Sequence, residues 1–460
     1  MDQTHISYFQ KEFQPICHTD TVSLEHYSHD ETEDLRFPPH VVLKPTSVEE
    51  ISSIMKYCNE NKVPVTPAGA RTGLSGGALP IKGGVLLSLE KFDKIISVDE
   101  NNHQVTTEPG VITQVLQDAV KEKGLFYPPD PASKGSCFIG GNVSENSGGP
   151  KAVKYGVTAD YVLNLEVVLP TGEVIWTGAN VLKNATGYNL TQLIVGSEGT
   201  LGIITKIVLK LIPHPTNDLL MLVPFFNATT ACEAVAAIFK AGITPSGLEF
   251  MEKDALTWTL AHIPDIKLSV DDRHEAHLLI EVDGFDESVL MQECEKIYTV
   301  LEQFETDEIL FAESQAQKDN LWEVRRKVGE AVKAHSIYKE EDTVVPRYEL
   351  PTLLKGVKSI GSKYGFKSVC YGHAGDGNLH VNIIKGELSE SVWEKELPKA
   401  IREIFELTIR LGGTISGEHG IGYVQKSYMD IPFRNNQLDL MRSIKKVFDP
   451  NGILNPEKIF

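Results

Sequence analysis

The sequence predicts a two-domain α+β protein, and three observations lead to this prediction. The chain has 460 residues, which is longer than a chain that folds around a single hydrophobic core usually is. From about residue 40 to 212, short β-rich runs alternate with helical runs and glycine-rich loops. From about 216 to 411, apolar strands alternate with long charged helices, typical of an antiparallel sheet with helices on one face. We place domains at 1–214 and 215–423, and a C-terminal segment at 424–460 that packs back on the first domain.

The elements of the first domain follow from local patterns. Period-two or continuous apolar runs predict strands at 41–43, 63–67, 84–89 and 105–107. Helical spacing of apolar residues predicts helices at 48–61 and 111–123. The turn sequence Pro170-Thr171-Gly172 predicts that residues 161–174 form a hairpin.

In the second domain the apolar runs 219–224 and 276–282 predict strands, and the charged stretches 322–334 and 396–411 predict helices. The tail is expected to form a helix at 438–447, which ends at the turn residues 449–452.

Charge and composition exclude several classes of function. The chain carries 63 acidic and 44 basic residues, a net charge of −19, which disfavours nucleic acid or an anionic membrane as a partner. The N-terminus lacks the features of a signal peptide, and no apolar run approaches the ~20 residues of a spanning helix. A cytoplasmic protein is expected, with attachment to the periphery of the inner membrane left open. Six scattered cysteines without a Cys-x-x-Cys pair argue against a disulfide scaffold, a zinc ribbon or an iron–sulfur site.

Two histidines flank a glycine-rich turn in the segment 371–380, Tyr-Gly-His-Ala-Gly-Asp-Gly-Asn-Leu-His. If residues 375–378 form the turn of a hairpin, His373 lies directly opposite His380 and both imidazoles point to one face. Such a pair can bind one ion of the zinc class. The alternative is that both are ordinary hydrogen-bonded histidines beside a turn.

The segment Gly417-Glu418-His419-Gly420 offers the rest of a metal site. Successive side chains of an extended chain point to opposite faces, so one of Glu418 and His419 can bind a metal ion while the other meets the substrate. Two histidines and a carboxylate with an open position form a recurring catalytic set. We therefore favour a divalent metal site of His373, His380 and Glu418, with zinc as the first choice and iron or manganese as alternatives.

Two glycine-rich loops are candidates for binding a cofactor. The first, residues 67–77, follows a strand and exposes backbone N–H groups that suit a pyrophosphate. It is neither a Gly-x-Gly-x-x-Gly nor a Walker loop. The second, residues 135–149, is rich in small polar residues and would let a flat ring lie against bare backbone. Either alone is compatible with a plain surface loop, but two such loops are hard to explain as spacers.

These motifs resemble a known family. The segments 68–73, 134–142 and 196–205, in this order, resemble the FAD-linked oxidases of the vanillyl-alcohol oxidase superfamily, with its PCMH-type flavin domain. The segments 373–380, 416–422 and 454–456 narrow the resemblance to the branch of D-lactate, D-2-hydroxyglutarate and glycolate dehydrogenases. The resemblance runs from about Pro38 to Phe460. It implies an FAD-binding α+β domain and an antiparallel-sheet cap domain, with the active site between them.

By position, the resemblance assigns the FAD pyrophosphate to Ala68, Gly69, Ala70, Arg71, Thr72 and Gly73. It assigns the remaining FAD contacts to Asp130, Gly140, Gly141, Asn142 and Ile203, and to Asn455 in the C-terminal segment. Superfamily members that attach FAD covalently use a histidine or cysteine near these loops. No histidine lies between Pro67 and Asn102, so FAD is expected to bind non-covalently.

The implied reaction is oxidation of a D-2-hydroxy acid to the 2-oxo acid, with hydride transfer from the α-carbon to flavin N5. The metal ion would acidify the hydroxyl group, and His419 suits the base because imidazole titrates near pH 6.5. The resemblance places at Arg325 the arginine that holds the substrate carboxylate. Arg325 lies three residues after Trp322, on the same side of the expected helix, and can face inward with it.

Two positions of the sequence bear on the choice of substrate. Members that act on D-2-hydroxyglutarate are expected to have a threonine four residues after the arginine and a lysine before the next strand. This chain has Gly329 at the first, and a one-residue shift of alignment decides between Lys339 and Glu340 at the second. An acidic residue there would repel a dicarboxylate, so D-lactate is our first choice. D-2-hydroxyglutarate dehydrogenase and the flavin subunit of a glycolate oxidase are alternatives.

Two other classes of protein remain open. One is a non-redox enzyme like the alkyl-dihydroxyacetone-phosphate synthases, and the other is an electron-relay subunit of a larger oxidase. The electron acceptor (quinone, electron-transfer flavoprotein, cytochrome or oxygen) and a homodimeric state are also left open.

Overall fold

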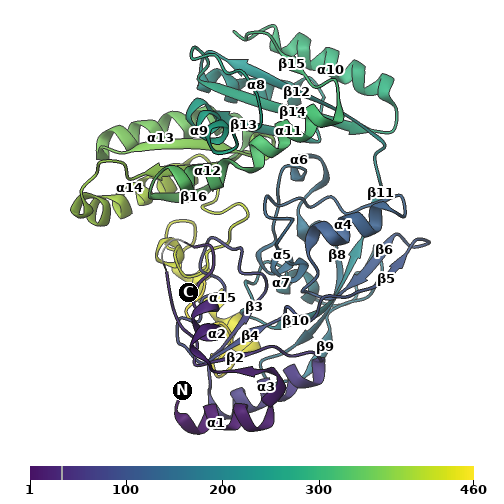
Figure 1. Cartoon of the computed structure of the whole chain (residues 1–460), viewed down its shortest axis with the longest axis vertical. Helices are drawn as coiled ribbons and strands as arrows, with labels where there is room; N and C mark the ends of the chain where they lie inside the picture. Colours follow the sequence, from purple (N-terminus) through teal and green to yellow (C-terminus); the bar gives the residue numbers. More distant parts are fainter. Residues whose placement is uncertain (33–34) are drawn as a thin grey trace. The chain divides into compact units, whose positions relative to one another are not determined.

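The computed structural model describes residues 1–32 and 35–460, which divide into two units (Figure 1). The first unit comprises residues 1–148, 157–214 and 418–460, and the second comprises 149–156 and 215–417. Both combine helices with sheets, so the predicted α+β class is confirmed.

The described residues of the first unit form three small sheets. The four-stranded sheet has the order β1 (Cys17–His18), β2 (Val41–Leu43), β4 (Val85–Ser88), β3 (Val65–Ala68), with β2, β4 and β3 parallel. The five-stranded antiparallel sheet has the order β5 (Ile95–Asp99), β6 (Gln104–Thr107), β10 (Ile203–Lys210), β8 (Val162–Val168), β9 (Val174–Trp176). The pair β7 (Leu125–Phe126) and β11 (Ile212–Pro213) forms the third.

Helices of the first unit cover these sheets. They are α1 (Gln3–Glu12), α2 (Thr21–His26), α3 (Val48–Asn61), α4 (Thr113–Lys121), α5 (Ile139–Glu145), α7 (Leu190–Ile194) and α15 (Asn435–Phe448). Helix α3 shows why the local sequence folds as it does. The Ser47 side chain accepts a hydrogen bond from the Glu50 N–H at the N-cap, and Ile51, Ile54, Met55 and Cys58 form its buried stripe.

The second unit is built on one seven-stranded antiparallel sheet. Its order is β15 (Leu310–Phe311), β12 (Asn217–Phe225), β14 (Ala276–Gly284), β13 (Gly247–Glu252), β17 (Lys367–Gly372), β18 (Asn378–Ile384), β16 (Tyr338–Val344). Its helices are α6 (Ala152–Tyr155), α8 (Ala228–Lys240), α9 (Lys253–His262), α10 (Glu287–Leu301), α11 (Gln315–Arg326), α12 (Val328–His335), α13 (Leu350–Tyr364) and α14 (Glu390–Arg410). Figure 1 shows α13 and α14 side by side.

Helices cover both faces of this sheet, so the prediction of helices on one face is wrong. Glu249 and Glu252 are three residues apart on β13 and point to opposite faces. Glu249 pairs with Arg325 of α11, whereas Glu252 pairs with Lys358 of α13. The apolar side chains under α9, α11 and α12 form one core with Leu220, Met251 and Tyr371 of the sheet.

The predicted helix at 322–334 is two helices. Helix α11 ends at Arg326 and α12 begins at Val328, because Lys327 between them leaves the helical conformation (φ −88°, ψ 0°). Arg325 therefore lies in the last turn of α11, and its side chain is buried.

The two units differ from the predicted domains at two points. Residues 149–156 belong with the second unit, and the change to the C-terminal part of the first unit falls between Gly417 and Glu418. The first difference has a clear cause. Lys151 pairs with Glu281 and Asp283 of β14, and Lys154 and Tyr155 both donate hydrogen bonds to Asp283 at 2.7 and 2.6 Å.

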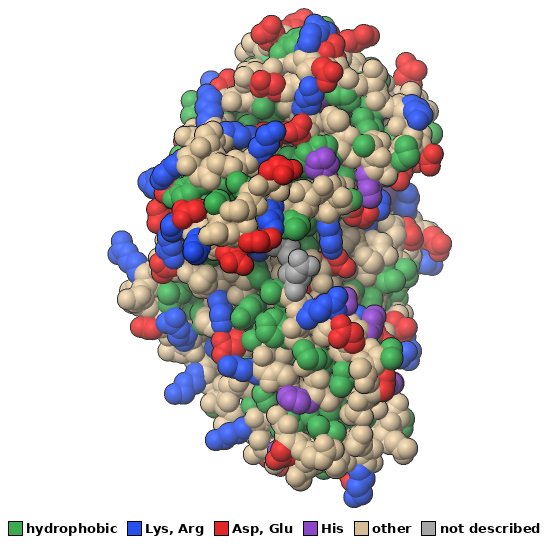
Figure 2. Space-filling model, turned by 60° about the vertical axis from the view of Figure 1, so that its left-hand side comes forward, with side chains coloured by type: hydrophobic (Ala, Val, Ile, Leu, Met, Phe, Trp, Pro, Cys, Tyr) green, Lys and Arg blue, Asp and Glu red, His purple; other side chains and the backbone are tan. Residues whose placement is uncertain are grey.

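The surface and the core agree with a folded globular chain. On the face that Figure 2 shows, acidic and basic side chains are intermixed. None of the six cysteines is disulfide-bonded, and all except Cys17 are buried. Among the described residues, no helix has both the length and the apolar character needed to cross a bilayer.

Replacing Asp283 should destabilise the second unit. Asp283→Asn removes the charge that pairs with two lysines in a buried setting, with an expected cost of about 3 kcal/mol. For a unit of this size that corresponds to a fall of about 6–12 °C in the unfolding midpoint, measured by calorimetry. The control is Asp272→Asn, which removes an ion pair whose carboxylate is 97% exposed and should shift the midpoint by less than about 2 °C. Equal shifts in the two variants would contradict this account.

Candidate active site

The first unit contains a cavity at its glycine-rich loops. The residues that line it include most of the predicted FAD contacts: Ala68, Gly69, Ala70, Arg71, Thr72, Gly73, Gly140, Gly141, Asn142 and Ile203. Glu418 and His419 also line it. Asp130 and Asn455 do not. Asp130 pairs with Lys134 at 2.9 Å beside the lining residues Pro131 and Ala132, and the Asn455 amide donates to the carbonyls of Gly77 and Glu198.

The lining fits a flavin nucleotide. A Cβ atom built on Gly73 or Gly141 would meet nothing within 4 Å, so the bare backbone faces open space there. A ring or a pyrophosphate can lie directly against such a backbone and accept hydrogen bonds from its N–H groups. The residues present therefore suit FAD.

Arg71 lines the cavity with the rest of its loop, and its side chain also contacts the N-terminal segment. Its guanidinium donates to the carbonyl oxygens of His26 and His29 and lies 4.4 Å above the Tyr27 ring. The main chain of Arg71 has φ at +60°. The assignment of this loop to the pyrophosphate depends on its backbone N–H groups and stays a prediction.

The buried carboxyl group of Glu198 supports the turn that follows His419, and Glu145 lies next to the same turn. The Glu198 carboxylate accepts hydrogen bonds from the N–H groups of Ile421 (2.8 Å) and Gly422 (2.6 Å). Burial raises the pKa of Glu198, and it raises the pKa of Glu145 well above its usual value, with the neighbouring Glu198 adding to the effect. Both carboxyl groups are among the residues that line the cavity.

The second unit brings His373 and His380 together, but not in the predicted register. Tyr371, not His373, lies opposite His380 in the β17–β18 pair. The connection is longer than a four-residue turn because residues 374–376 form a 3₁₀ turn and Gly377 adopts φ +85° before β18 begins. The two imidazoles still meet, with ring centroids 5.5 Å apart and planes at 81°.

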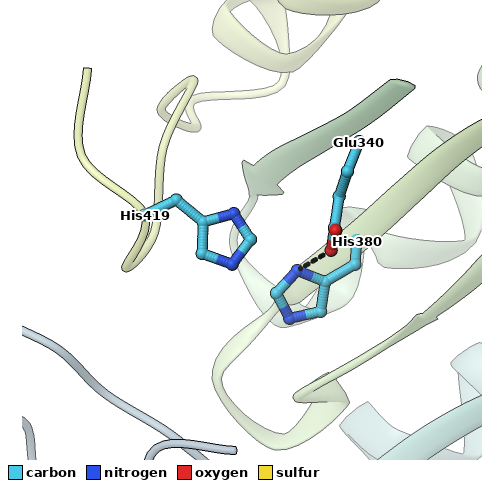
Figure 3. Close-up of side chains that lie close together, drawn as sticks. All are labelled: Glu340, His380 and His419. Atoms are coloured by element: carbon cyan, nitrogen blue, oxygen red, sulfur yellow. Dashed lines mark ion pairs between the residues drawn. The ribbon is translucent and has the colours of Figure 1, made fainter. Parts of the chain in front are cut away.

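A carboxylate lies near Nδ1 of each imidazole. His373 Nδ1 is hydrogen-bonded to the fully buried carboxylate of Glu249, at 2.8 and 3.0 Å from its two oxygens. His380 Nδ1 lies at ion-pair distance from Glu340 Oε1, 3.3 Å (Figure 3). In many metal sites a carboxylate hydrogen-bonded to Nδ1 holds the proton there, and the metal ion is bound by Nε2. The donor set therefore fits a divalent metal.

Arg325 lies beside the histidine pair. Its Nη2 is 2.6 Å from Glu249 Oε2, and its guanidinium lies 5.1 Å from the Tyr371 ring centroid. Its buried Nε has no hydrogen-bond partner among the described residues. Burial penalises the Glu249 charge, but His373 and Arg325 outweigh this penalty and hold the pKa of Glu249 below its usual value.

The chain that leads to Glu418 is fixed to the same sheet. The Gly417 N–H donates to Asp342 Oδ2 at 2.8 Å, and the Ser416 hydroxyl donates to the same oxygen at 3.1 Å. Asp342 lies opposite His380 in the β16–β18 pair. Glu418 and His419 follow directly in sequence and belong to the first unit.

Comparison with known families decides the classification. Residues 39–178 match the FAD binding domain family, and residues 214–459 match the family described as FAD linked oxidases, C-terminal domain. The chain belongs to the FAD-linked oxidases.

This FAD-linked oxidase is similar in sequence to named relatives over most of its length. It is 41% identical to "Glycolate oxidase subunit GlcD" of Bacillus subtilis over 94% of this chain and 92% of the relative. It is 40% identical to "D-lactate dehydrogenase" of Anaerostipes hadrus over 95% and 92%. It is 34% identical to "D-2-hydroxyglutarate dehydrogenase" of Xanthomonas citri pv. viticola over 96% and 93%. The chain is thus an FAD-linked oxidoreductase of the D-lactate, D-2-hydroxyglutarate and glycolate dehydrogenase type.

Solved structures support the fold of this FAD-linked oxidase. p-Cresol methylhydroxylase with substrate bound aligns with a TM-score of 0.77 at 18% identity, over 100% of this chain and 97% of that one. An alkyldihydroxyacetonephosphate synthase aligns with a TM-score of 0.75 at 17% identity, over 99% and 85%. At these identities the likeness concerns the fold alone, and it is the predicted PCMH-type fold.

Sequence reasoning missed several residues of this FAD-linked oxidase. Glu249 lies in the apolar strand β13 with no local motif around it, and only the tertiary structure brings it to Arg325 and His373. Asn382 is fully buried, and neither atom of its amide has a hydrogen-bond partner among the described residues. Its signal in the sequence is its position two residues after His380, on the same face of the strand.

Substitution of Gly420 should weaken FAD binding. Gly420 has φ +77°, and a Cβ there would collide with the Glu145 carboxylate and approach Glu198 to 3.1 Å. Because Glu145 lines the cavity, Gly420→Ala should lower FAD affinity about tenfold, or ~1.4 kcal/mol. The control is Gly452→Ala, with φ +65° and open space, which carries only the backbone strain of roughly 1 kcal/mol. The FAD dissociation constant of each apoprotein measures the difference, and equal constants would refute the role of the turn.

Proposed function

We propose that this FAD-linked oxidase oxidises a small D-2-hydroxy monocarboxylate, with D-lactate as the first choice, to the 2-oxo acid. The observation that carries the proposal is the carboxylate of Glu340. It lies beside His380 on the face of the sheet that also holds Arg325 and Tyr371.

The strand register supports Glu340, not Lys339, as the residue beside the site. Glu340 pairs with Asn382 in the β16–β18 register, whereas Lys339 pairs with Ile383. Successive residues point to opposite faces, so Glu340 shares the face of His380 and Lys339 points away from it. The Tyr371 hydroxyl donates to Glu340 Oε1 at 3.2 Å. A fixed negative charge there disfavours the second carboxylate of D-2-hydroxyglutarate.

Gly329 supports the same choice of substrate. A Cβ on Gly329 would lie 3.2 Å from the Tyr371 hydroxyl, so this position faces the tyrosine and carries no polar side chain. The site thus has one buried arginine for one carboxylate. Because Nε of this guanidinium has no hydrogen-bond partner among the described residues, its N–H group can donate a hydrogen bond to a substrate oxygen. The unsatisfied amide of Asn382 is a second group that a ligand would satisfy.

We also propose a divalent metal ion, zinc first, held by His373, His380 and Glu418. The carboxylates at Nδ1 of both histidines support it, as does the Asp342 anchor of the segment before Glu418. When bound, such an ion acidifies a coordinated hydroxyl group. His419, which lines the FAD cavity, is our candidate for the base that takes the hydroxyl proton. FAD, when bound, accepts the hydride from the α-carbon.

Glycolate is the second candidate substrate. It is also a small monocarboxylate, so the arguments from Glu340 and Gly329 apply to it equally. The relatives named for glycolate oxidase and for D-lactate dehydrogenase are about equally similar to this chain, at 41% and 40% identity.

Anaerobic titration of the purified protein tests the substrate. The flavin absorbance near 450 nm should bleach with D-lactate, or with glycolate if the second candidate is right, and at least about tenfold less efficiently with D-2-hydroxyglutarate, or ~1.4 kcal/mol. L-Lactate is the control for chirality. Preference for D-2-hydroxyglutarate would overturn the argument from Glu340. An oxidised spectrum with every hydroxy acid would favour a non-redox synthase or an electron-relay subunit.

Separate variants test the metal and the base. His380→Ala should lose the metal, measured by elemental analysis, while retaining FAD. His419→Ala should retain both and reduce the rate of flavin reduction by about 10²–10⁴-fold. A wild-type protein without a stoichiometric divalent metal, or one that keeps its activity after chelation, would exclude the metal. Wild-type reduction rates in His419→Ala would exclude His419 as the base.

A further inference from the structure

Glu249 is a carboxylate with no exposure to solvent, in the middle of strand β13. Burying an ionised carboxylate costs several kcal/mol unless donors and positive charges meet it. An apolar residue at this position would stabilise the fold as well as a buried, paired carboxylate does, or better. The presence of a carboxylate here therefore calls for an explanation in terms of what it holds.

Both oxygens of Glu249 are used, and the two partners come from different elements. Oε2 lies 2.6 Å from Arg325 Nη2 at the end of α11. Oε1 and Oε2 lie 3.0 and 2.8 Å from His373 Nδ1, which follows β17. Arg325 Nη2 and His373 Nδ1 are themselves only 3.4 Å apart. Two donors this close are held together by the acceptor between them.

The contacts with Glu249 use defined atoms of both partners. Arg325 meets Glu249 through Nη2, and its Nε has no hydrogen-bond partner among the described residues. His373 meets Glu249 through Nδ1, so the proposed metal contact falls to Nε2. One carboxylate thus orients the proposed anchor of the substrate carboxylate and one proposed metal ligand at once.

A second glutamate on the same strand offers a comparison. The Glu252 side chain is only 12% exposed, but it points to the opposite face, where it pairs with Lys358 at 2.8 Å and accepts from the Cys370 N–H at 2.7 Å. Neither partner is a candidate for substrate or metal. Glu252 therefore represents a buried pair with a purely structural role.

We propose that Glu249 is a positioning residue of the active site, which fixes the guanidinium of Arg325 and the Nδ1–H tautomer of His373 together. This inference rests on the proposed function. It adds that Glu249 supports both substrate binding and metal binding. A substitution of Glu249, which is neither a metal ligand nor a substrate contact, should therefore weaken both.

The chemistry of glutamine makes the substitution specific. Both neighbours of Glu249 are donors, and the Gln side chain offers one acceptor oxygen and one NH₂ group, which is itself a donor. Glu249→Gln can satisfy either Arg325 or His373, and its NH₂ group must face the other. The shape of the residue is nearly unchanged, so the packing of β13 is preserved.

The experiment compares Glu249→Gln with Glu252→Gln. Zinc affinity is measured by competition with a chromophoric chelator on metal-free protein, and KM and kcat are measured with D-lactate. Glu249→Gln should weaken zinc binding about 10–100-fold and raise KM at least about tenfold, with an unchanged ratio of FAD to protein. Glu252→Gln should lower the unfolding midpoint but leave zinc affinity and KM within about twofold of wild type. Glu249→Asp, which keeps the charge, should recover part of the zinc affinity.

The outcomes separate the two proposals. Wild-type zinc affinity and KM in Glu249→Gln would overturn the role of Glu249 while the proposed function stands. Equal losses in Glu249→Gln and Glu252→Gln would also overturn it, because the effect would then be one of stability. A wild-type protein that binds no zinc and is reduced by no hydroxy acid would overturn the proposed function and the role of Glu249 with it.

Discussion

The seven-stranded sheet of the second unit is organised by the need to compensate buried carboxylates. A carboxylate removed from water must be met by donors or cations, and each one here recruits a different segment of chain. Glu249 holds the end of α11, and Glu252 holds α13. Asp283 holds residues 149–156, and Asp342 holds the segment that precedes Glu418. The segments that carry candidate catalytic groups are therefore positioned by charge, while the apolar core fixes the sheet itself.

In the first unit, hydrogen bonds to the main chain position the segments around the cavity. Its cavity is lined by loops in which small residues leave the backbone accessible, and Glu198 secures the chain after His419 through two N–H groups. The Asn455 amide joins the carbonyls of Gly77 and Glu198 in the same way. Because these contacts use the backbone, they depend on the path of the chain more than on side-chain identity.

The sequence predicted the α+β class, the helix at 48–61, the strand at 41–43 and most of the cavity lining, because these depend on local periodicity and on contiguous motifs. It did not predict the break at Lys327 or the register of β17 with β18, since both are set by tertiary packing and by a longer turn. Arg71 lies in the predicted loop, and its side chain also contacts the N-terminal segment. Glu249 had no local signal because its partners lie 76 and 124 residues away in sequence.

The alternation of side chains along β16 has an evolutionary consequence. Lys339 and Glu340 carry opposite charges on adjacent positions, and the pleat presents only one of them to the histidine pair. Sliding this edge strand by one residue would exchange an acidic wall for a basic one without changing any amino acid. A one-residue insertion or deletion before residue 338 is thus a short mutational path by which this scaffold could reverse the charge beside the histidine pair.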